Sequence, residues 1–185
     1  MAGRSYTGNV IVPMQPSNLG EPFSAPTWLF EPKWDGYRAI CYYDKSCIRF
    51  IARRNNGLTK WFPELRTLDL RADAAIIDGE IVAIDDDGVP TFDELRKSCR
   101  SCAVVFNAFD LLTLNGEAIR NLPLLKGKSL LKRIVRRTKN TELDSQIILL
   151  ATAWRYSPNL SGNNSKEWSQ RRLIANTKAE ERGTG

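Results

Sequence analysis

The run Ala74-Ala75-Ile76-Ile77-Asp78-Gly79-Glu80-Ile81-Val82-Ala83-Ile84 constrains the fold more than any other stretch of the chain. Its β-branched residues predict a strand. Asp78 and Glu80 are two positions apart, so both side chains would lie on one face of that strand. Carboxylates on an apolar strand are costly to bury unless they meet hydrogen-bond donors or a metal ion. The two residues are therefore functional candidates, and the alternative interpretation is a hairpin turn at Asp78-Gly79.

The length and composition indicate one soluble domain. A chain of 185 residues can build a real core, and 42% hydrophobic with 26% charged residues is ordinary for a globular protein. No apolar run reaches membrane-spanning length, and Met1 to Asn9 lacks the apolar segment of a secretory signal. We therefore expect a cytoplasmic protein without a membrane partner.

Positive charge is concentrated in the last third. Residues 1–120 carry 14 Lys/Arg against 16 Asp/Glu, whereas residues 121–185 carry 13 against 5, and the net charge is +6. A near-neutral body with a basic end is typical of a protein that meets a polyanion through one region. The alternative is a solvated basic helix without a specific partner.

Cys99 and Cys102 have the spacing of a zinc or redox pair. The chain has no histidine, and the other two cysteines, Cys41 and Cys47, do not form a second close pair. This pattern favours ordinary strand and loop cysteines over a metal site, and no disulfide is expected in a reducing compartment.

The remaining pattern predicts an irregular leader over 1–26, a core over 27–150 and a less regular part over 151–185. Strands are predicted at Trp28–Phe30, Tyr37–Tyr43, Cys47–Arg53, Ala74–Ile84, Ala103–Leu112 and Gln146–Leu150. Short helices are predicted from Phe62, with Thr59 as cap, and over Phe92–Lys97. An amphipathic helix with Leu124, Leu125, Leu130, Leu131, Ile134 and Val135 on its apolar side is predicted over Leu122–Thr138, and a polar one over Lys166–Arg182.

The stretch Lys33-Trp34-Asp35-Gly36-Tyr37-Arg38 suits covalent nucleotidyl transfer. In that chemistry a lysine amine attacks the α-phosphate of a nucleoside triphosphate, pyrophosphate leaves, and a lysyl-nucleotide remains. The amine must be neutral, and a neighbouring cation such as Arg38, a bound metal and partial burial would all lower its pKa. Gly36 would allow a sharp turn or a close approach to a phosphate. The alternative is a simple hairpin turn at Asp35-Gly36.

Three segments in this order resemble the ATP-dependent DNA ligase family, and the ligase domain of bacterial end-joining repair ligases in particular. They are Phe30–Arg38, Asp78-Gly79-Glu80 continuing to Gly88–Phe92, and Phe109–Leu112 with Asn115-Gly116. The resemblance covers about Trp28 to Leu131. It implies an α+β nucleotidyltransferase fold with two antiparallel sheets, helices outside and ATP between the sheets.

The resemblance also implies residue roles. Lys33 would be the adenylylated nucleophile, Glu31 would contact the adenine, and Phe109 would stack on it. Arg38 and Arg53 would contact the ribose or the phosphates, and Glu80 would bind the ribose or Mg²⁺. The implied cofactors are ATP and Mg²⁺. The implied partners of an expected monomer are nicked or broken duplex DNA and end-joining proteins such as Ku.

Two later motifs of the family are missing. No glutamate occurs between Glu142 and Glu167, where a Glu-Gly motif is expected, and Trp168 is followed by Ser169-Gln170-Arg171-Arg172 instead of a lysine pair. No oligonucleotide-binding barrel follows. We therefore expect a truncated ligase adenylation domain, acting in DNA repair and recombination, with impaired catalysis. The alternatives are a non-catalytic ATP- or DNA-binding remnant and an RNA-capping or RNA-joining nucleotidyltransferase.

Overall fold

The computed structural model describes residues 11–13, 29–32, 34–85, 90–97 and 102–135, together with the backbone of 173–176. The predicted leader and the strand at Gln146–Leu150 lie outside these residues, except for 11–13. Within the described part of the chain, no helix combines the length and the apolar character that crossing a membrane requires.

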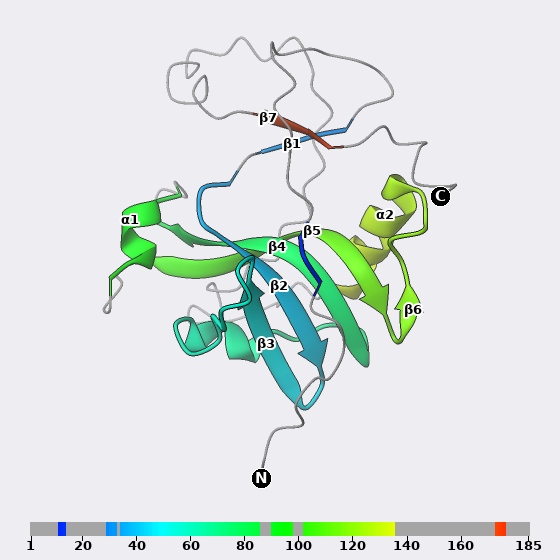
Figure 1. Cartoon of the computed structure of the whole chain (residues 1–185), viewed down its shortest axis with the longest axis horizontal. Helices are drawn as coiled ribbons and strands as arrows, with labels where there is room; N and C mark the ends of the chain where they lie inside the picture. The colour runs from blue at the N-terminus through cyan, green and yellow to red at the C-terminus, as the bar shows by residue number, and fades with distance from the viewer. Residues whose placement is uncertain are drawn as a thin grey trace.

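A five-stranded antiparallel sheet forms the centre of the molecule (Figure 1). Its strand order is β3-β2-β4-β5-β6. The strands are β2 (Tyr37–Asp44), β3 (Cys47–Ala52), β4 (Ala74–Ile84), β5 (Ala103–Leu114) and β6 (Glu117–Ala118). The predicted strands that correspond to β2, β3, β4 and β5 are confirmed, whereas β6 was not predicted. Asn115 and Gly116, both with positive φ (48° and 90°), form the tight turn that joins β5 to β6.

A separate two-stranded ladder lies above this sheet in Figure 1. It pairs β1 (Leu29–Pro32) with β7 (Leu173–Asn176), antiparallel, with Glu31 opposite Ile174. The strand predicted ahead of Lys33 is thereby confirmed. The polar helix predicted over Lys166–Arg182 is wrong at β7, because the backbone there is extended and pairs with β1.

Few helices accompany the sheet in the part of the chain that the structure describes. They are the 3-10 helix η1 (Pro63–Thr67) and the α-helices α1 (Phe92–Leu95) and α2 (Leu124–Ile134). Thr59 does not cap η1, because its hydroxyl oxygen instead accepts a hydrogen bond from the Phe50 amide at 2.9 Å. Helix α2 packs against β5, but Leu125, predicted on its apolar side, is exposed.

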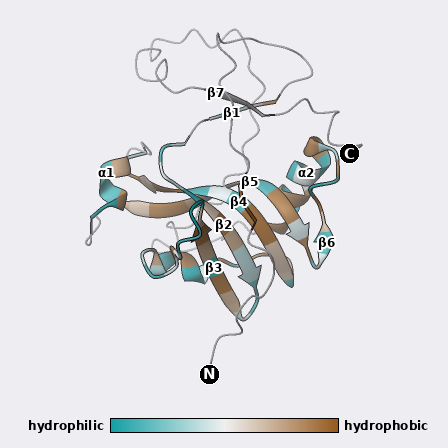
Figure 2. Cartoon of the chain, viewed as in Figure 1, coloured by the Kyte–Doolittle hydropathy of each residue, from teal (hydrophilic) through white to brown (hydrophobic). Residues whose placement is uncertain are grey.

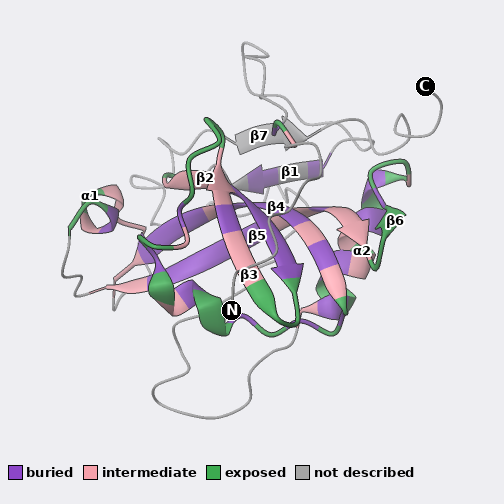
Figure 3. Cartoon of the chain, turned by 60° about the horizontal axis from the view of Figure 1, so that its bottom comes forward, coloured by how far each residue is buried: buried purple, intermediate pink, exposed green. Residues whose placement is uncertain are grey.

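The hydrophobic core lies against one face of the five-stranded sheet. Alternate residues of β2 and β4 enter it, as the period of a strand requires, and the rings of Phe50 and Phe106 meet edge to face at 5.0 Å. Figures 2 and 3 show apolar and buried residues concentrated along the central strands. The residues in between, among them Arg38 and Asp78, face the other side of the sheet.

Strand β4 continues through Asp78-Gly79, with a shift in its register against β5 between the two residues, so the hairpin alternative at this pair is wrong. Gly79 pairs with Ala39 of β2 and Ala108 of β5. A Cβ atom at position 79 would lie 2.5 Å from the Phe106 ring and 2.6 Å from the carbonyl oxygen of Asn107. The glycine is therefore required by close packing in the middle of the sheet rather than by a turn.

Candidate functional site

Arg38 and Asp78 form a bidentate ion pair on the sheet face opposite the core. Arg38 Nε donates to one carboxylate oxygen at 2.6 Å, and a terminal guanidinium nitrogen donates to the other at 2.8 Å. The Asp78 side chain is 8% exposed, whereas that of Arg38 is 26% exposed. Burial raises the pKa of Asp78, and the hydrogen bond and charge of Arg38 act against that rise. The predicted need of the buried carboxylate for donors is met by Arg38.

The same guanidinium also lies over the ring of Phe109. Arg38 Cζ is 4.3 Å from the ring centroid, which is a cation–π contact. Two predicted site residues from β2 and β5 are thereby brought together. One face of the Phe109 ring is occupied by Arg38, so a base that stacks on this ring must use the other face or displace the guanidinium.

Glu31 and Phe109 are joined by Lys128 of α2. Lys128 Nζ donates to Glu31 Oε1 at 2.5 Å and to the Phe109 carbonyl oxygen at 2.6 Å. The side chains of Lys128 and Glu31 are each only 10% exposed. A buried carboxylate without a partner is strongly destabilising, so the Glu31 side chain needs this lysine. The two contacts of Lys128 thereby connect β1 with α2 and β5.

The pairing of the strands places Glu80 and Arg53 beside Arg38 or next to it. Glu80 is the Cα partner of Arg38, and it is half-buried. Ala52, the last residue of β3, pairs with Ala39, which follows Arg38 in β2. Arg53 comes directly after Ala52 and begins the next turn, so its backbone lies beside that end of β2. The side chain of Arg53 is exposed. Among the described residues, no group of three or more His, Cys, Asp or Glu side chains is placed to hold a metal ion.

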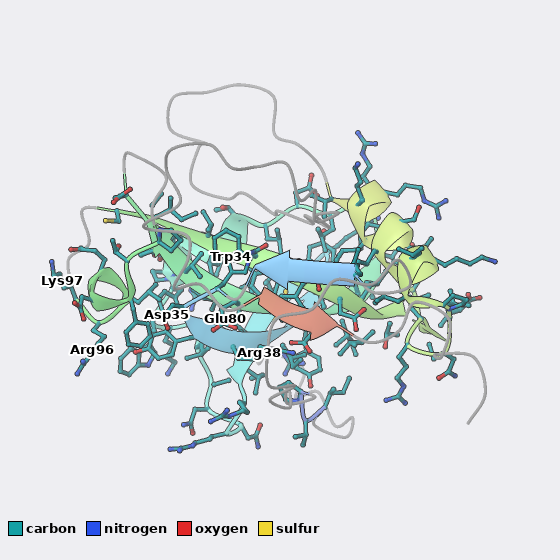
Figure 4. The ribbon with its side chains drawn as sticks, turned by 90° about the horizontal axis from the view of Figure 1, so that it is seen from above. Trp34, Asp35, Arg38, Glu80, Arg96 and Lys97 are labelled. Atoms are coloured by element: carbon teal, nitrogen blue, oxygen red, sulfur yellow. The ribbon has the colours of Figure 1, made fainter. Side chains whose placement is uncertain are left out.

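The proposed nucleophile, Lys33, lies outside the described residues, but its neighbours on both sides are placed. Glu31 is buried, Trp34 is half-buried and Asp35 is exposed. A Cβ atom at Gly36 would lie 2.1 Å from the Ile81 carbonyl oxygen, so this turn is pressed against β4. Figure 4 shows Trp34, Asp35, Glu80 and Arg38 near β1 and β7, with Arg96 and Lys97 farther out at α1.

The cysteines take no part in this cluster. Cys41 is buried in the core, Cys47 is exposed and Cys102 is half-buried, and none of these three forms a disulfide. Cys99 lies outside the described residues.

Lys128 is the site residue that sequence reasoning missed. The sequence shows it only as one of several cations on a basic helix. A signal was nevertheless present, because Leu124, Lys128, Leu131 and Val135 follow the spacing of a single helix face. A lysine inside the apolar stripe of a helix must find a buried acceptor, and here it finds Glu31.

Comparison with known proteins places this arrangement in a family. The family model for the ATP dependent DNA ligase domain matches residues 15–151. The multifunctional non-homologous end joining protein LigD of Mycobacterium bovis is 37% identical over 119 residues, 63% of this chain and 16% of that protein. The SPbeta prophage-derived DNA ligase-like protein LigB of Bacillus subtilis is 31% identical over 130 residues, 67% of this chain and 47% of that protein.

Solved structures agree with these relatives. The ligase domain of M. tuberculosis LigD has a TM-score of 0.52 and 35% identity, covering 59% of this chain and 37% of that one. Mycobacterial DNA ligase D complexed with ATP and MES has a TM-score of 0.51 and 32% identity over the same shares. The chain thus spans less than half the length of these relatives. From the family model, the relatives and the shared fold together, we conclude that this chain belongs to the ATP-dependent DNA ligase domain family.

Proposed function

We propose that this chain is the nucleotide-binding and adenylation part of an ATP-dependent DNA ligase. One observation carries the proposal most directly. Glu31, Arg38 and Phe109, three residues that the family resemblance links to the nucleotide, come from three different strands and lie in one chain of contacts: Lys128 joins Glu31 to the Phe109 carbonyl oxygen, and Arg38 lies over the Phe109 ring.

The proposed reaction is adenylylation of Lys33. The neutral Lys33 amine attacks the α-phosphorus of ATP, so that a P–N bond forms. The bond from that phosphorus to the oxygen bridging the β-phosphate breaks, pyrophosphate leaves with the electron pair, and the attacking nitrogen releases one proton to solvent. Arg38 offers a guanidinium at this face, and its charge is balanced by the Asp78 carboxylate.

Among the described residues, we propose one protein ligand for Mg²⁺. Glu80, which the family resemblance links to the ion, is half-buried on β4 and is proposed to hold it together with phosphate oxygens of ATP, whereas Asp78 is engaged by Arg38. Mg²⁺ is commonly held by one or two carboxylates and substrate phosphates, so one protein ligand is sufficient. When bound, the ion neutralises charge on the phosphates.

We propose that catalysis is impaired. Negative charge gathers on the α-phosphate and on the departing pyrophosphate, and the family's later Glu-Gly and lysine motifs are missing from the sequence. Losing one electrostatic group of this kind lowers a rate by roughly 10²–10³, and at least two are missing. Only trace adenylylation is expected.

The proposed second substrate is nicked or broken duplex DNA. Lys126, Lys132 and Arg133 are exposed on α2 and offer phosphate contacts. Such binding should weaken steeply as salt rises and show no sequence preference. A binding curve that is flat between low and high salt would leave α2 as a solvated basic helix.

The deciding experiment is incubation of the purified chain with radioactive ATP and Mg²⁺. Mass spectrometry would locate the adduct, Lys33→Ala would serve as the unlabelled control, and a nicked duplex would test sealing. We expect a faint label on Lys33 and no sealing. Labelling by GTP in preference to ATP would contradict the proposed function, and sealing at an ordinary family rate would contradict the proposed impairment.

A further inference from the structure

We infer that Lys128 is a positioning residue that sets the preference of this site for adenine over guanine. The inference rests on the proposed function, because it assigns a role within the same nucleotide site. Lys128 is neither expected to touch the reacting atoms nor implied by the sequence motifs. It acts through the two groups that it holds, the Glu31 carboxylate and the Phe109 backbone.

The contacts of Lys128 fix these two groups relative to each other. Its ammonium donates to Glu31 Oε1 at 2.5 Å and to the Phe109 carbonyl oxygen at 2.6 Å. Glu31 comes from the two-stranded ladder and Phe109 from the five-stranded sheet, so the lysine bridges the two sheets. With only a tenth of each charged side chain exposed, water cannot readily replace either partner.

An oriented carboxylate discriminates between purines. Adenine carries an amino group at the ring position where guanine carries a carbonyl oxygen. A carboxylate only accepts hydrogen bonds, so it favours the adenine amino group and repels the guanine oxygen. Glu31 can act in this way only while its carboxylate is held in one place relative to Phe109, the residue expected to stack on the base. The Lys128 ammonium, already engaged by a carboxylate and a carbonyl group, supplies that restraint.

The test is calorimetric titration of ATP and GTP into four forms of the whole chain. They are the wild type, Lys128→Met, Lys128→Arg and Arg120→Met, the last removing an exposed cation ahead of α2. We expect Lys128→Met to weaken ATP binding roughly tenfold or more, the effect of losing a charge-assisted hydrogen bond, with GTP changing by less than about threefold. Lys128→Arg should restore most of the ATP preference, and Arg120→Met should behave as the wild type.

A second variant covers the case in which Lys128→Met does not fold. Glu31→Gln combined with Lys128→Gln keeps a neutral hydrogen-bonding pair, and because an amide both donates and accepts, the ATP preference should nearly vanish. A purely structural lysine would leave the ATP-to-GTP ratio of the folded protein unchanged, and that result overturns the inference alone. A wild-type chain that binds both nucleotides equally also overturns it. A wild-type chain that binds neither nucleotide overturns the proposed function as well.

Discussion

Replacing Gly79 with alanine is the sharpest test of the described sheet. The added methyl group would lie 2.5 Å from two atoms of the Phe106 ring and 2.6 Å from the Asn107 carbonyl oxygen. Phe106 is fully buried and packs against Phe50, so its ring has little room to turn away. The Asn107 oxygen belongs to the backbone of β5, which cannot retreat without disturbing the β4–β5 ladder.

The expected loss of stability follows from these contacts. Overfilling a packed core typically costs about 1–3 kcal/mol. Alanine recovers about 0.4–1 kcal/mol by restricting the unfolded chain, but the backbone clash places this site at the upper end of the range. We therefore expect Gly79→Ala to lower the free energy of unfolding by about 2–3 kcal/mol. For a chain of this length, Tm should fall by about 5–10 °C.

Urea denaturation followed by circular dichroism would measure this loss. Gly57→Ala is the matched control, because a Cβ atom there meets nothing within 4 Å, and its stability should change by less than about 0.5 kcal/mol. Combining Gly79→Ala with Phe106→Leu should lose less than the sum of the single losses, since a smaller side chain relieves part of the clash. If Gly79→Ala proved as mild as Gly57→Ala, the packing of β4 against β5 described above would be wrong.

Three further predictions address the site and the core. Burial raises the folded-state pKa of Asp78 above its ordinary value of 3.8. The free energy of unfolding of the wild type, relative to that of Asp78→Asn, should therefore decline as pH rises from about 3.8. If urea titrations showed this difference rising with pH, the charge of Arg38 rather than burial would dominate the pKa of Asp78. ATP binding, measured by calorimetry, should weaken more in Phe109→Ala than in Lys33→Ala, because stacking does not need the nucleophile, and an unchanged Phe109→Ala affinity would count against the site. Iodoacetamide should modify exposed Cys47 in the native protein and spare Cys41, whose thiol pKa is raised by burial; equal rates would place β2 outside the core.

The sequence by itself determined the family and the strands β2 to β5, but not β6 or β7. The run Ala74–Ile84 became β4 with the predicted bounds, because its β-branched residues favour the extended backbone of a strand. The three ordered motifs led to the ligase family, which the family model matches. These features depend on short stretches of chain and can be recognised without knowing what packs against them.

Only the tertiary structure decided which charged groups meet. Lys128 and Glu31 are separated by 97 positions, and Arg38 and Asp78 by 40, so no local pattern links them. The position of Gly79 against Phe106 likewise depends on how β4 and β5 align in register. Buried charges need opposite charges or donors, but that requirement leaves the partner open. The partner is selected by the way in which the strands and α2 pack, and here that packing makes Lys128 part of the site.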